Sequence, residues 1–87
     1  MEFEFDPAKS AVNKDKHGID FLEAQALWKD GKLVEAPSLY ESEERTIAVG
    51  MIEGKHWSAI YTLRADRVRL ISVRRSRERE VKYYEGQ

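Results

Sequence analysis

The spacing of apolar residues changes once along this chain, near residue 32, and that change constrains the fold more than any other feature. Up to Gly31, apolar side chains recur at intervals of three and four residues, which is the spacing of one face of a helix. From Leu33 to Arg75 the period is two, as in strands with one buried face. Helices followed by a run of strands, rather than alternating with them, predict an α+β fold.

Two helices are predicted in the first third of the chain. The first starts at Asp6-Pro7, where the carboxylate can cap the helix and proline loses nothing by lacking an N–H, and it ends at Gly18. The second starts at Asp20, which forms a capping-box-like pair with Glu23, and it ends at Gly31.

Three strands are predicted at residues 45–52, 56–63 and 68–75, joined by tight turns at Glu53-Gly54 and Ala65-Asp66. Shorter strands are expected at 3–5 and 33–34, and an acidic loop at 41–44. If both connections are plain hairpins, one sheet face carries Ile47, Val49, Met51, Trp57, Ala59, Tyr61, Val68, Leu70, Ser72 and Arg74. A bulge would move residues from one face to the other. Ser76 is the expected N-cap of a last helix.

Composition narrows the class of protein. The 87 residues suffice for one domain, spanning 1–87, and 41% hydrophobic residues in patterned blocks do not suit a disordered chain. There is no cysteine, which excludes disulfides and thiolate metal sites and fits a reducing cytoplasm. No apolar run approaches the roughly 20 residues of a membrane helix. No metal-binding motif or phosphate-binding glycine loop is present, so neither metal nor cofactor is expected.

Charge is distributed unevenly in a chain whose net charge is only −1. Residues 64–82 contain eight Arg and Lys residues against three acidic ones. This segment begins as a strand and ends as the start of a helix, whose free N–H groups attract anions. Guanidinium groups suit phosphate because their forked donors bind two oxygens at once. The run therefore indicates a nucleic-acid surface, although Glu78 and Glu80 could equally form ordinary ion pairs with these arginines.

Aromatic and histidine residues near this segment have two interpretations each. Tyr61 and Tyr84 could stack on bases, or they could be core aromatics with one edge exposed to solvent. His17 and Lys16 could take part in catalysis, or they could simply be favourable cations at the end of the first helix.

Motifs at both ends of the chain resemble the BrnT family, the toxins of a bacterial type II toxin–antitoxin system. Near the start these are Phe3–Lys9, Asn13, Lys16–Ile19 and Phe21–Ala24. Further along they are Glu44-Arg45, Gly50, Tyr61-Thr62, Arg64, Asp66–Ser72, Arg74, Glu80 and Tyr84. The resemblance spans nearly the whole chain in the right order.

The resemblance implies a RelE-like fold, with two N-terminal helices packed on an antiparallel β-meander and a C-terminal helix. It also implies a ribonuclease that inhibits growth until it is bound by a BrnA-like antitoxin. In such a pair, operator DNA is bound only through the antitoxin complex.

Metal-free RNA cleavage needs a base, an acid and cations that stabilise the charge growing on phosphorus. We therefore expect catalytic roles among Arg64, Arg74, Glu80, Tyr84 and His17. RNA-binding roles are expected of Lys16, Arg45, Tyr61, Arg69, Arg75 and Arg77. The arginines are phosphate clamps, because arginine does not readily give up its proton. The base and acid stay open among Glu80, Tyr84, Tyr61, His17 and Lys16.

Two alternatives accompany this hypothesis. The chain could be a binding module that uses its basic end to hold nucleic acid or an acidic protein without cleaving anything. The arginines could also serve mainly as the antitoxin interface, which is compatible with catalysis on the same surface. The RNA target, ribosome dependence and stoichiometry of the antitoxin complex do not follow from the sequence.

Overall fold

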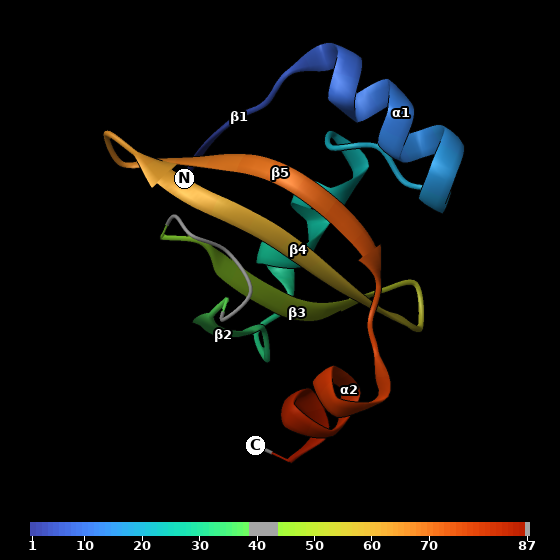
Figure 1. Ribbon diagram of the computed structural model, residues 1–87. Helices are drawn as coiled ribbons and strands as arrows, with labels where there is room; N and C mark the ends of the chain where they lie inside the picture. Colours follow the sequence, from blue (N-terminus) through green and yellow to red (C-terminus); the bar gives the residue numbers. More distant parts are fainter. Residues whose placement is uncertain (39–43, 87) are drawn as a thin grey trace.

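A computed structural model of the chain describes residues 1–38 and 44–86 (Figure 1). Its elements, in chain order, are β1 (Glu2–Glu4), α1 (Pro7–His17), the 3-10 helix η1 (Glu23–Lys29), β2 (Val34–Pro37), β3 (Thr46–Ile52), β4 (Lys55–Arg64), β5 (Arg67–Arg75) and α2 (Glu78–Glu85). The predicted α+β class is confirmed. Most of the predicted acidic loop, residues 41–43, lies outside the described residues.

All five strands belong to one sheet with the order β1-β5-β4-β3-β2. Strands β2 to β5 pair antiparallel with their neighbours, so the predicted meander is confirmed. Strand β1 pairs with β5 in parallel, with Phe3 opposite Val68, which makes the sheet mixed. A parallel partner needs a long crossover connection, and here α1, η1 and the meander provide it.

The helix boundaries show which local signals are reliable. Asp6 caps α1 by accepting the backbone N–H of Ala8 at 2.9 Å, and Gly18 ends the helix at φ 82°. The predicted capping box of Asp20 and Glu23 also forms: each side chain accepts the other residue's backbone N–H. The segment that follows is a seven-residue 3-10 helix instead of the expected α-helix. Most 3-10 helices are only three or four residues long, so this one is longer than usual.

The predicted strand register was wrong in two places. The turn at Glu53-Gly54 has positive φ at both residues and sets Ile52 opposite Lys55, which puts Ala48 opposite Ala59. Residues 47, 49 and 51 therefore lie on the face opposite to that of residues 57, 59 and 61. Between β4 and β5, Tyr61 pairs with Leu70 but Ile60 pairs with Ser72. Ile71 of β5 is therefore an extra, bulged residue.

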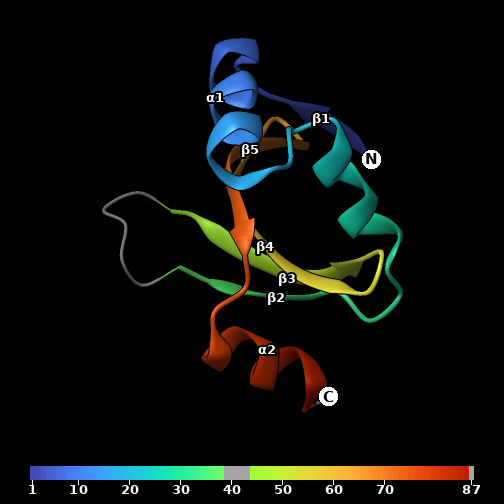
Figure 2. The same cartoon turned by 90° about the vertical axis from the view of Figure 1, so that its right-hand side faces the viewer.

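The core lies on one face of the sheet, covered by η1 and the segment before it. Its buried residues are Ile19, Phe21, Ala24, Leu27, Ala48, Ala59, Tyr61, Val68, Leu70 and Val73. Gly50 allows η1 to approach closely, since a Cβ there would lie 2.9 Å from Leu33 and 3.1 Å from Leu27. Helix α2 lies on the other side of the sheet from η1 (Figure 2). The bulge places Ser72 and Arg74 on the side of α2, away from Val73.

Candidate functional site

Arg74 and Glu80 form a two-pronged ion pair where β5 leads into α2. Arg74 Nη1 donates to Glu80 Oε1 at 2.7 Å, and Nη2 donates to Oε2 at 2.8 Å. Both side chains are mostly buried, with 20% and 14% of their surface exposed. This geometry holds the planar guanidinium in one orientation. It also raises the already high pKa of Arg74, so the group stays cationic.

The carboxylate of Glu80 is held by two further donors. Ser58 Oγ donates to Oε1 at 2.9 Å, and the backbone N–H of Arg77 donates to Oε1 at 2.8 Å. Burial alone would raise the pKa of Glu80, but hydrogen bonds from Arg74, Arg77 and Ser58 outweigh it and lower that pKa to about 2. Glu80 is therefore a fixed anion. A carboxylate with so low a pKa is a weak general base at neutral pH.

The start of α2 lies one residue later than expected. Arg77, not Ser76, is the N-cap, and the Glu80 carboxylate accepts the Arg77 backbone N–H. Ser76 Oγ instead forms a hydrogen bond of 2.7 Å with Ser58 Oγ. Arg77 itself is exposed at this helix start.

Helix α2 is fastened to the sheet by its aromatic and acidic side chains. The hydroxyl of Tyr84 donates to Asp30 Oδ2 at 2.7 Å, and the same oxygen accepts the backbone N–H of Met51. The hydrogen bond to Asp30, with burial, raises the pKa of Tyr84 to about 12, so this phenol does not release its proton at neutral pH. His56 lies edge-on to the Tyr84 ring and contacts Glu85 at 2.7 Å through Nε2.

The side chains of three other predicted arginines lie away from this pair. Arg69 and Arg64 reach Glu4 of β1, at 3.2 Å and 4.0 Å. Arg69 lies five positions before Arg74 on the strand, roughly 17 Å away. Arg75 extends over Trp57 on the opposite sheet face, 5.5 Å from its ring centre. The expected cluster of arginines is thus divided among several places.

Two more predicted RNA-binding residues are Tyr61, which lies in β4, and Arg45, which lies just before β3. Tyr61 is buried with 5% of its surface exposed, packs against Trp28 and donates its hydroxyl to Glu35. Its ring is therefore not available to stack on a base in this structure. Arg45 directly precedes β3 and is half-buried.

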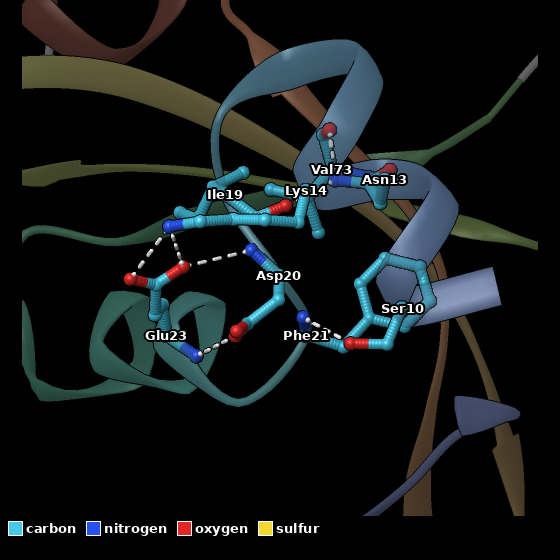
Figure 3. A network of polar contacts seen from close by, with 8 residues as sticks. All are labelled: Ser10, Asn13, Lys14, Ile19, Asp20, Phe21, Glu23 and Val73. Atoms are coloured by element: carbon cyan, nitrogen blue, oxygen red, sulfur yellow. Dashed lines mark hydrogen bonds and ion pairs between the residues drawn. The ribbon is translucent and has the colours of Figure 1, made fainter. Parts of the chain in front are cut away.

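Lys16 and His17 end α1, which runs beside β5. The carboxamide of Asn13 fixes this arrangement, because it accepts the N–H of Val73 at 3.2 Å and donates to the carbonyls of Val73 and Ile19 (Figure 3). Asn13 thereby satisfies both backbone groups of the residue immediately before Arg74. Lys16 and His17 line a pocket with Ser72, two residues before Arg74 on the same strand.

Three residues that shape the site were not predicted as part of it: Ser58, Asp30 and His56. Ser58 is fully buried between Trp57 and Ala59 in β4, and a polar residue at such a position usually has a specific partner. That signal could have identified it. No such signal in the sequence points to Asp30 or His56, because their partners are distant in the sequence. Within residues 1–38 and 44–86, no three His, Asp or Glu side chains are grouped so that they could hold a metal ion.

The model of one protein family, the BrnT ribonuclease toxin of type II toxin–antitoxin systems, matches residues 5–80 of this chain. The chain belongs to the BrnT toxin family. BrnT membership makes it a ribonuclease toxin with RNA targets and an antitoxin partner. Among curated proteins, no sequence matches it significantly. In the described parts of this BrnT chain, no helix is both long and apolar enough to cross a membrane.

Proposed function

We propose that this BrnT protein is a metal-independent endoribonuclease with a RelE-like fold, which suppresses growth in the cytoplasm by cutting RNA. The observation that supports it best is the Arg74 guanidinium, held in place by Glu80 on the sheet face opposite the core. A BrnA-like antitoxin would inhibit the toxin by covering this surface, and operator DNA would be bound only by the toxin–antitoxin complex.

In the proposed reaction, the ribose 2′-oxygen loses its proton and attacks the adjacent phosphorus. The bond from phosphorus to the 5′-oxygen then breaks, and that oxygen takes up a proton. Arg74 stabilises the negative charge that grows on the phosphoryl oxygens, as a preoriented cation should. The products are a 2′,3′-cyclic phosphate and a 5′-hydroxyl.

The contacts of each candidate narrow the choice of the residue that moves the proton. Glu80 is held by Arg74 with a pKa of about 2, and Tyr84 has a pKa of about 12 while donating to Asp30. Tyr61 is buried. We therefore assign Glu80 to positioning Arg74 and Tyr84 to holding α2. His17 is left to move the proton, with Lys16 beside it.

The decisive experiment measures RNA cleavage in excess EDTA by the wild type, Arg74→Ala and Arg74→Lys. We expect full activity in the wild type and a loss of about 100-fold or more in kcat for Arg74→Ala, as for removal of a single transition-state donor. Arg74→Lys should remain impaired because lysine lacks the planar fork. Arg67→Ala, which removes one exposed charge from the same strand, is the control and should keep its kcat.

Two results would contradict the proposal. Activity abolished by EDTA and restored by magnesium would show that the mechanism needs metal. RNA that is bound tightly but stays intact, together with normal growth on expression, would favour a binding module without catalysis.

A further inference from the structure

An open pocket of about 290 Å³ lies between α1 and β5. Its lining comes from one face of the helix and from two neighbouring residues of the strand: Ala8, Lys9, Val12, Asn13, Lys16, His17, Ile71 and Ser72. The helical residues form two rows at intervals of four, so they lie along one side of α1. Asn13 sets the distance between helix and strand, since it is bonded to Val73 (Figure 3).

The bulged part of β5 forms one wall of this pocket. Ile71 is the extra residue of the bulge, so its side chain is released from the alternation that buries Leu70 and Val73. Together with Ala8 and Val12 it contributes apolar surface. Val12 is 63% exposed, so its side chain is accessible to a ligand in the pocket.

Two of the polar residues that line the pocket are lysines, which carry positive charge. Lys9 and Lys16 are exposed on the helix, and His17 is half-buried. A site with an apolar wall and a cationic rim suits a nucleotide, whose base is flat and weakly polar and whose phosphate is an anion. Ser72 then leads to Arg74 on the same sheet face, about 7 Å further along the strand.

We propose that this pocket binds one nucleotide of the RNA substrate, adjacent to the phosphate that Arg74 contacts. The base lies against Val12 and Ile71, and the phosphate of that nucleotide lies between Lys9 and Lys16. This inference rests on the proposed function, because it assumes that RNA crosses Arg74. It adds a binding subsite, and with it a role for Lys9 and Val12.

The test uses binding of a short 2′-O-methyl RNA, which cannot be cleaved, measured by fluorescence anisotropy on the full chain. Lys9→Glu and Val12→Glu should each weaken binding about tenfold or more, since each puts an anion where a phosphate or base belongs. The matched controls are Lys29→Glu and Ala11→Glu, which introduce the same charge at exposed helical positions outside the pocket lining. They should bind nearly as the wild type does.

Each outcome separates the subsite from the enzymatic function. If Lys9→Glu and Val12→Glu bind like their controls, the subsite is wrong even where the wild type cleaves RNA. If both lose the antitoxin but keep RNA binding, the pocket is an antitoxin surface and the proposal is overturned. If they lose RNA binding while the wild type fails to cleave natural RNA, the subsite stands and the enzymatic proposal fails. Equal melting temperatures of all four variants show that the fold is intact.

Discussion

The Glu80 carboxylate connects β4 to the end of β5 and the start of α2. It accepts hydrogen bonds from Arg74 at the end of β5, from Ser58 in β4 and from the backbone of Arg77 before α2. Arg74 and Glu80 were both expected in the site from the family motif. An ion pair between Glu80 and the nearby arginines was one of the interpretations of the sequence, but the role of the buried Ser58 was not predicted, because only the register of β4 against β5 brings residue 58 opposite residue 74.

The charge of Glu80 should contribute to stability in a pH-dependent way. Its pKa is about 2 in the folded chain against an ordinary value of 4.5. The contribution is complete above pH 4.5 and is lost as pH falls toward about 2, because the unfolded chain takes up the proton first. Glu80→Gln should cost about 2 kcal/mol of unfolding free energy at pH 7, allowing for solvent screening.

Urea unfolding of wild type and Glu80→Gln at pH 7, 5 and 3.5 checks this expectation. The difference between the two proteins should narrow at the lowest pH. Glu78→Gln is the matched control, because Glu78 lies on the same helix, is 86% exposed and faces Lys82 at 3.5 Å. A difference between wild type and Glu80→Gln that stays constant with pH would contradict the assignment.

At the scale of elements, local chemistry was enough to place the ends of α1 and both hairpin turns. Asp6 acts through its side-chain cap, and Gly18 and Gly54 act through their own backbone conformation, so their effects can be recognised in the sequence. The β5 bulge could not be predicted, because no turn residue marks Ile71. It results from packing, since both Leu70 and Val73 are buried in the core.

Helix α1 should depend strongly on Asn13. Asn13→Ala leaves the N–H and C=O of Val73 and the carbonyl of Ile19 without their partner in a buried position. We expect a loss of about 3 kcal/mol in unfolding free energy, measured by urea denaturation. Val12→Ala, at the exposed neighbouring position, should cost little. Equal stabilities of these two variants would show that the carboxamide does not anchor the helix.

Helix α2 should depend on Tyr84 in the same manner. Tyr84→Phe removes the hydrogen bond to Asp30 and should lower the unfolding free energy by about 2 kcal/mol. It should also reduce RNA cleavage, because α2 carries Glu80. Tyr83→Phe is the control: its hydroxyl is 3.4 Å from the Glu35 carbonyl and its side chain is exposed. A Tyr84→Phe variant as stable and active as Tyr83→Phe would refute this role.

For the whole molecule, the distribution of charge in space differs from its distribution in the sequence. The sequence groups eight cations within residues 64–82, which predicted a basic nucleic-acid surface. In the fold, Arg64 and Arg69 lie beside Glu4, and Arg67 lies 3.8 Å from Glu2. Parallel pairing of β1 with β5 brings these acids from the other end of the chain. One end of the expected surface is therefore largely neutralised.

This arrangement predicts a shallow dependence of RNA binding on salt. Each phosphate contact to a single strand contributes about 0.7 to the slope of log Kd against log salt concentration. If Arg74, Lys9 and Lys16 make the main contacts, the slope should be about 2, whereas all eight cations of the basic segment would give a slope near 6. Anisotropy titrations of 2′-O-methyl RNA over a range of NaCl concentrations distinguish these values. Lys9→Gln should then lower the slope by about 0.7, while Arg67→Gln should leave it unchanged, because Arg67 already faces Glu2. A steep slope that falls equally in both variants would show that RNA lies along the whole strand and that the acids of β1 do not shield it.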